Sequence, residues 1–170
     1  QLDPTVSVPR YASAVDIHCM PGGYHTEVVP DDVSAGANYD SGIFATTAGM
    51  LGRMTAGGRQ AVAQWLTGTH PGFKPGRILD IGCTIGHNVV PLAQAYPEAE
   101  VVAVDVAAPM LRYGHARAKS LGVSNLTFRQ ADGEHLDYPD GHFDLIMTSM
   151  FWHETSSTAM PRMLREIHRM

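Results

Sequence analysis

From residue 75 onward, the sequence alternates short runs that are apolar throughout with segments in which apolar residues recur at helical spacing. The apolar runs predict strands, and they are residues 77–81, 100–105, 125–130 and 143–149. The segments 88–96, 109–121 and 158–170 predict helices. Strands that are apolar on both faces need cover on both faces, which is typical of a parallel sheet with right-handed helical crossovers. The sequence therefore predicts an α/β fold with a doubly wound parallel sheet.

The chain divides into three parts by composition. Residues 1–42 hold four prolines and no sustained period, and they predict an irregular arm that lies over the site as a lid. Residues 43–74 show interrupted helical spacing and predict a helical lead-in. Residues 75–170 form the α/β part, and in such sheets ligands bind beyond the carboxyl ends of the strands.

Composition excludes several classes of protein. The chain has 170 residues, of which 44% are apolar and 17% charged, so it is long enough for one folded domain and is not disordered. Its net charge of −5 and scattered basic residues argue against nucleic acid, and no apolar run is long enough to span a membrane. Two cysteines, Cys19 and Cys83, form no disulfide framework, which favours a cytoplasmic location.

The loop after the first predicted strand, residues 80–88, is a candidate ligand loop because it leads directly into a helix. A dinucleotide site needs glycine at the first, third and sixth positions, but counted from Gly82 these positions hold Gly82, Thr84 and His87. The loop also lacks the lysine of a phosphate loop, so the sequence argues against both kinds of site. A carboxylate at Asp80 suits a ligand with an ammonium or sulfonium group.

The next two strand ends indicate a nucleoside. Asp105 follows the second strand at a spacing near that of an acid that binds ribose hydroxyls. Met110 is a flexible, polarisable side chain suited to the face of a flat base. After the third strand, Asp132 can accept a hydrogen bond from an exocyclic amine, and Gly133 lets the backbone approach the ring.

These motifs, in this order, resemble those of class I S-adenosylmethionine-dependent methyltransferases, which have a Rossmann-like fold. The resemblance covers residues 75–170 and rests on 78–83 with Gly86, on Asp105 with 110–111, on 132–134 and on 143–146. It implies methyl transfer to a small-molecule acceptor, with S-adenosylmethionine as cofactor and S-adenosylhomocysteine as product. The residues implied to bind the cofactor are Asp80, Gly82, Cys83, Gly86, Asp105, Val106, Met110, Asp132, Gly133 and Ser149.

The sequence departs from this family in two respects. Thr84 stands where the family usually has a second glycine, and a β-branched residue disfavours positive φ and adds bulk beside the ligand. The family's sheet has seven strands, whereas four are predicted here. We therefore expect a sheet truncated after the fourth strand and its helix, in a chain that is a fragment and whose exposed apolar edge favours a homo-oligomer.

Methyl transfer needs alignment and, for a protonated acceptor, a base. His153, after the fourth strand, is the candidate base, with Glu154 to orient it. The sequence 149–152 lacks the prolines typical of methyltransferases that act on adenine or on amides, which favours another small-molecule acceptor. The spacings of His18, Cys19 and His25 match no tetrahedral metal site, so no metal is predicted.

Two further expectations concern the arm and the alternatives. Tyr24 and Tyr39 are predicted to close over the ligand, and Arg53 to pair with its carboxylate. Two other functions stay open: a non-catalytic module with a methyltransferase-like fold, and a nucleoside-binding enzyme of another reaction class, such as a decarboxylase or cyclase.

Overall fold

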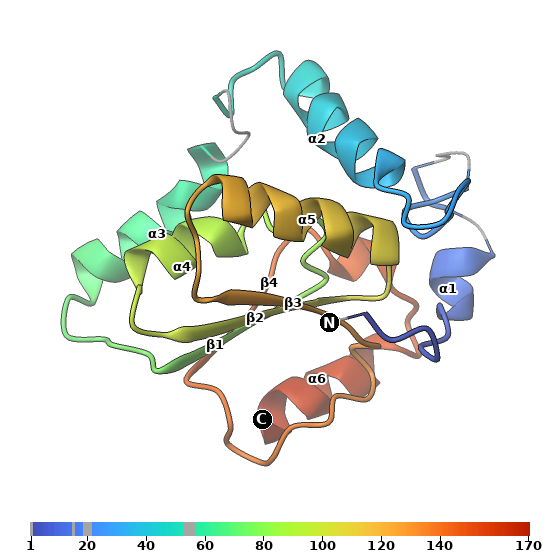
Figure 1. The fold of residues 1–170 in the computed structure, drawn as a ribbon. Helices are drawn as coiled ribbons and strands as arrows, with labels where there is room; N and C mark the ends of the chain where they lie inside the picture. Colours follow the sequence, from blue (N-terminus) through green and yellow to red (C-terminus); the bar gives the residue numbers. More distant parts are fainter. Residues whose placement is uncertain (1, 15, 19–21, 53–56) are drawn as a thin grey trace.

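The chain folds around a four-stranded parallel sheet (Figure 1). This computed structural model describes residues 2–14, 16–18, 22–52 and 57–170. The order across the sheet is β3-β2-β1-β4, so the chain runs outward from β1 and then returns to its other side with β4. This topology confirms the predicted α/β fold. The strands are β1 (Arg77–Ile81), β2 (Glu100–Asp105), β3 (Leu126–Gln130) and β4 (Leu145–Thr148).

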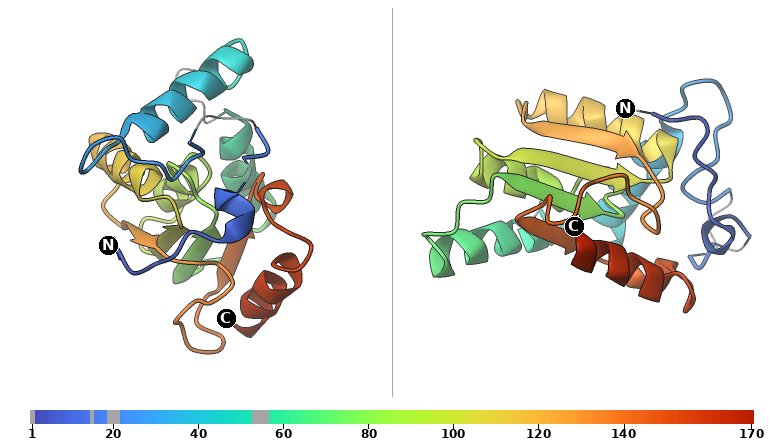
Figure 2. Two further views of the ribbon diagram at one scale, coloured as in Figure 1. Left: turned by 90° about the vertical axis from the view of Figure 1, so that its right-hand side faces the viewer. Right: turned by 90° about the horizontal axis from the view of Figure 1, so that it is seen from below.

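Helices cover both faces of the sheet (Figures 1 and 2). α4 and α5 lie on one face with α3 beside α4 and α2 outside α5, while α6 lies on the opposite face. No described helix is long and apolar enough to cross a membrane. The helices are α1 (Arg10–Ser13), α2 (Ser34–Thr46), α3 (Gly57–Thr69), α4 (Val89–Ala95), α5 (Ala108–Ser120) and α6 (Met160–Arg169), with a short 3-10 helix η1 (Trp152–Glu154) after β4.

Each face of the central strands contributes to a separate core, so these strands carry apolar residues on both faces. Ile78 and Val101 pack with the α4 and α5 side, whereas Leu79 and Val104 pack with the α6 side. Ile78, Leu79 and Val101 are fully buried, and each such side chain contributes about 1.5–3 kcal/mol to stability. β4 lies at the edge and is only partly buried, so association through this edge stays a prediction.

The arm is more regular than the sequence predicts. α1 and most of α2 fall inside the segment 1–42 that was predicted to be irregular, and α2 begins at Ser34 rather than at Ile43. Only Gly36 of α2 is buried, so the helix shows no apolar stripe. A Cβ at Gly36 would come within 2.4 Å of Tyr113, which explains a small residue where α2 crosses α5. Cys19 and Arg53 lie outside the described residues.

One polar side chain joins the start of β3 to the carboxyl end of α4 and to the turn before β2. The Asn125 amide nitrogen, just before β3, donates to the carbonyls of Ala93, Tyr96 and Ala99 at 3.0–3.1 Å. These carbonyls belong to the end of α4 and the turn into β2. Asn125 thus fixes the connection that carries the chain from one strand to the next.

We predict that Asn125→Ala lowers the free energy of unfolding by about 1–3 kcal/mol, since partly buried carbonyls lose their donor. Ser124→Ala, one residue earlier and exposed, is the control and should change it by less than about 0.5 kcal/mol. Chemical denaturation followed by circular dichroism measures both values. Equal stability of the two variants would contradict this role.

Candidate functional site

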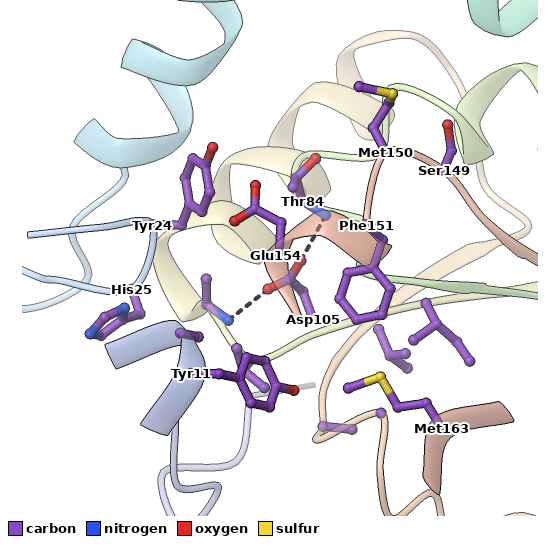
Figure 3. A pocket seen from close by; sticks show the side chains of 18 of the residues that line it. Tyr11, Tyr24, His25, Thr84, Asp105, Ser149, Met150, Phe151, Glu154 and Met163 are labelled. Carbon is purple, nitrogen blue, oxygen red and sulfur yellow. Dashed lines mark hydrogen bonds between the residues drawn. The ribbon is translucent and has the colours of Figure 1, made fainter. Parts of the chain in front are cut away.

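A cavity of about 990 Å³, measured with its open mouth, lies at the carboxyl end of the sheet. Figure 3 shows that the side chains around it come from the strand ends and from the arm. The strand ends contribute Ile81, Gly82, Thr84, Val104, Asp105, Val106, Ala131, Gly133, Ser149, Phe151 and Glu154, and the arm contributes Tyr11, Asp16, Ile17, Tyr24, His25 and Tyr39.

Asp105, at the end of β2, organises the floor of the cavity. Its Oδ2 accepts a hydrogen bond from the Thr84 backbone N–H at 2.9 Å, and its Oδ1 accepts one from the Ala107 N–H at 2.9 Å (Figure 3). Burial raises the pKa of the Asp105 carboxyl, while these backbone hydrogen bonds act in the opposite direction. The carboxylate also lines the cavity, where a ligand donor can reach it.

Thr84 adopts the left-handed conformation that the family's glycine would adopt, with φ of +49°. A β-branched residue there costs about 1–2 kcal/mol, and its hydrogen bond to Asp105 offsets that cost. The Thr84 side chain forms part of the cavity wall. Met150, on the far side of the cavity, also has a positive φ, of +53°. Such strained residues gather at functional sites.

Gly82 is required by both its backbone and its surroundings. Its φ is +73°, and a Cβ there would lie 2.2 Å from the ring of Phe151. Phe151 follows β4, so its ring packs directly on the loop after β1 across the two adjacent strand ends. The loop after β1 and the segment after β4 are thus packed closely against each other.

Half of the sequence-predicted cofactor residues line the cavity. They are Gly82, Asp105, Val106, Gly133 and Ser149. The other half do not appear in the lining of this cavity and are Asp80, Cys83, Gly86, Met110 and Asp132. Their role in ligand binding stays a prediction. The packing around each residue explains why it does not line the cavity.

Asp80 and Cys83 lie beneath the loop. Asp80 is fully buried and precedes Ile81, so strand alternation directs its side chain away from the wall that Ile81 forms. Cys83 is fully buried in the core on the α4 side, and burial raises the pKa of its thiol well above the usual value. A thiol of this kind stays protonated and packs as a small apolar group.

The remaining residues support neighbours that line the cavity. Gly86 has a φ of +81°, and Phe128 packs where its Cβ would be. Met110 is fully buried beneath Ala107 and next to Tyr24 and Tyr39, so it supports the wall from behind. The Asp132 side chain accepts the Glu134 N–H at 2.9 Å and faces a neighbouring hollow beside Tyr11.

The candidate base and its partner exchange positions relative to the prediction. Glu154 lines the cavity and points into it beside Asp105 (Figure 3), whereas His153 does not line it and is exposed. The two residues belong to η1, in which successive side chains project about 120° apart. The Glu154 carboxylate therefore lines the cavity, and Nε2 of His153 lies 3.4 Å from it.

The arm supplies aromatic walls, as predicted for Tyr24 and Tyr39. Their rings meet edge to face with centroids 5.6 Å apart. Burial raises the pKa values of Tyr24 and of Tyr11, another lining residue, so both phenols stay protonated and can donate hydrogen bonds. Tyr11 was not predicted from the sequence because an isolated aromatic residue in a proline-rich stretch carries no period.

A buried polar group fastens this wall to the sheet. The Asp40 carboxylate of α2 lies 2.7 Å from Nε2 of His87 and accepts the Tyr113 hydroxyl at 3.0 Å. Although burial favours the protonated acid, the hydrogen bonds from His87 and Tyr113 lower the pKa of Asp40. His87 belongs to the loop after β1, so α2 is tied to the loop that carries Gly82 and Thr84.

Residues 78–170 match a family that is described as a methyltransferase domain. This match covers more than half of the chain, and the chain belongs to the methyltransferase-domain family. The same stretch holds β1 to β4, Asp105, Gly82 and Glu154, so most of the cavity lies within the family's domain. The arm that completes the cavity precedes it.

Several curated relatives are methyltransferases by name. The chain is 34% identical over 114 residues to a demethylmenaquinone methyltransferase of Symbiobacterium thermophilum, a match covering 65% of this chain and 42% of that protein. It is 37% identical over 74 residues to nocamycin O-methyltransferase of Saccharothrix syringae, covering 43% of this chain and 26% of that protein. The chain thus spans less than half the length of these curated relatives.

The fold is similar to that of a candidate S-adenosyl-L-methionine-dependent methyltransferase from Methanococcus maripaludis. Its crystal structure aligns with a TM-score of 0.64 and 18% identity, and the alignment covers 85% of this chain and 61% of that one. At this identity, the comparison supports the fold.

We predict that Thr84→Gly raises the free energy of unfolding by about 0.5–1 kcal/mol. Relief of left-handed strain returns about 1–2 kcal/mol, and the added freedom of glycine in the unfolded chain costs about 0.5–1 kcal/mol. Thr127→Gly is the matched control, because Thr127 is exposed within β3 and the same change there should destabilise. If thermal unfolding shows both variants destabilised alike, Thr84 is not strained.

Proposed function

We propose that this protein transfers the methyl group of S-adenosylmethionine to a small-molecule acceptor. The single observation that carries this proposal is the Asp105 carboxylate, which lies at the end of β2 and lines the cavity. Two adjacent hydroxyls on one ribose match two carboxylate oxygens side by side. Membership of the methyltransferase-domain family supports the same cofactor.

The lining residues suit the three parts of the cofactor. The ribose hydroxyls would donate to Asp105, and the adenine would lie over Val106 with its edge toward Gly133. The methionine part would follow the loop at Gly82, which lines the cavity together with Phe151. Carboxylates at Asp16 and Glu154 make the cavity favourable for the ammonium and sulfonium charges.

The chemical step needs little from the protein beyond alignment. A lone pair of the acceptor forms a bond to the methyl carbon while the S–CH3 bond breaks, and its electron pair stays on sulfur as a neutral thioether. A proton on the acceptor passes to a base. Glu154 lines the cavity where such a proton would be released, and His153 contacts Glu154 from outside. We therefore propose Glu154 as the group facing the acceptor, with His153 behind it.

A small acceptor is favoured by the enclosure of the cavity. Tyr11, Tyr24 and Tyr39 of the arm close one side, and a protein or nucleic-acid chain would have to displace them. The two relatives named for demethylmenaquinone and nocamycin support this class of acceptor. With S-adenosylmethionine labelled in its methyl group, label should appear in the solvent-soluble small molecules of a cell extract. Label confined to precipitated protein or nucleic acid would refute this acceptor class.

We predict that Asp105→Ala weakens S-adenosylmethionine binding by about 10- to 150-fold, which corresponds to about 1.5–3 kcal/mol for charge-assisted hydrogen bonds. Isothermal titration calorimetry with S-adenosylmethionine and S-adenosylhomocysteine measures the change. Asp137→Ala is the control, since Asp137 is exposed and outside the cavity lining. An unchanged affinity of Asp105→Ala would remove the assignment, and binding without any transfer would favour a non-catalytic module.

The same affinity should depend on pH. The ionised carboxylate accepts from both hydroxyls, whereas protonation replaces one acceptor with a donor. Because burial raises the pKa of Asp105, binding should weaken on acidification at a higher pH than an exposed aspartate would produce. In Asp105→Ala this loss should be absent over the same range. Calorimetric titrations across the mildly acidic range compare the two proteins, and identical pH profiles would contradict the prediction.

A further inference from the structure

Two histidines and a glutamate from distant parts of the chain meet beside the cavity. Nε2 of His18, in the arm, lies 2.7 Å from Oε1 of Glu154. Nε2 of His153 lies 3.4 Å from the same oxygen and 3.4 Å from Nε2 of His18. The ligand atoms of the three residues all lie within 4.8 Å of one another.

We propose that His18, His153 and Glu154 bind a zinc ion at the edge of the cavity. A zinc ion bonded to nitrogen at about 2.0–2.1 Å in tetrahedral geometry separates its ligand atoms by about 3.3 Å. Two of the three separations match this value, because Nε2 of His153 lies 3.4 Å from Oε1 of Glu154 and 3.4 Å from Nε2 of His18. The third, 2.7 Å between Nε2 of His18 and Oε1 of Glu154, is a hydrogen-bond distance that the bound ion would lengthen. Imidazole nitrogen together with a carboxylate oxygen is a donor set that zinc prefers.

The surroundings of the cluster favour a cation. The Asp16 carboxylate accepts the backbone N–H of His18 at 2.7 Å, and Asp16 also lines the cavity. The ring of Tyr24 lies edge to face with His18 at a centroid distance of 6.2 Å, which holds the imidazole in place. Negative charge from Asp16 and Glu154 therefore lies around the point on which the three ligands converge.

Three protein ligands leave one tetrahedral position open, as in catalytic zinc sites. Glu154 carries its carboxylate into the cavity (Figure 3), so the metal would lie at the cavity wall. In a part of the inference that rests on the proposed function, an acceptor hydroxyl would take the open position. The metal would favour loss of its proton to solvent before the oxygen attacks the methyl carbon.

The test is titration of the metal-free protein with Zn²⁺ by calorimetry, without cofactor. One equivalent of Zn²⁺ should bind. His18→Ala and His153→Ala should each weaken zinc binding by more than roughly 100-fold, which is the loss expected when a residue that only supports a metal ligand is removed. His168→Ala is the control among the nine histidines of the chain, because His168 is exposed on α6, away from the cluster. Co²⁺ should give the intense visible absorption of a tetrahedral site in the wild type and in the control.

Zinc affinity that is the same in His18→Ala, His153→Ala and the wild type would overturn the proposal, as would the absence of zinc binding by the wild type. Circular dichroism and thermal unfolding of the two variants separate loss of a metal ligand from loss of the fold, because both histidines are exposed. The zinc result stands by itself, so a protein that binds zinc but no S-adenosylmethionine would contradict the proposed function and leave the metal site intact.

Discussion

The site depends on one carboxylate that joins two loops. Asp105 accepts the backbone N–H of Thr84 from the loop after β1 and that of Ala107 from the turn after β2. Parallel strands bring these two loops to the same edge of the sheet, but the strands alone do not fix the loops relative to each other. The Asp105 carboxylate does so together with the Val104 carbonyl, which accepts the N–H groups of Gly82 and Cys83, and Asp105 also lines the cavity.

This interaction also explains how an unfavourable residue persists at the centre of the site. Thr84 holds a left-handed backbone that costs about 1–2 kcal/mol, and a hydrogen bond to a carboxylate is worth about 1.5–3 kcal/mol. The two terms are of similar size, so the hydrogen bond offsets the cost of the left-handed backbone. The Thr84 side chain lines the cavity.

The sequence predicted the sheet well and the cavity in part, for different physical reasons. Strands buried on both faces produce continuous apolar runs, so β1 and β2 begin and end where their patterns do. A side chain's direction depends on packing, and Cys83 and Met110 turned out to support the wall from within the core. The arm carries no period, since α2 packs through glycine and polar groups, so its helix could not be recognised.

Contacts between segments far apart in the chain could not be predicted from the spacing of residues in the sequence. His18 meets His153 and Glu154 only because the arm passes over the end of β4, and no local pattern connects residues so far apart in the chain. The same limit applied to Asp40 and His87, whose pairing closes the arm onto the sheet.

The attachment of α2 through Asp40 separates the site into parts that can change independently during evolution. The ends of β1 and β2 are constrained by each other and by the core beneath them, whereas the arm between its anchoring points meets the cavity mainly through tyrosine and histidine side chains. Substitutions in the arm alter the shape offered to an incoming molecule without disturbing Asp105 or the glycine loop. Proteins with this arrangement can therefore come to admit different molecules through changes in the arm, while the buried sheet stays the same.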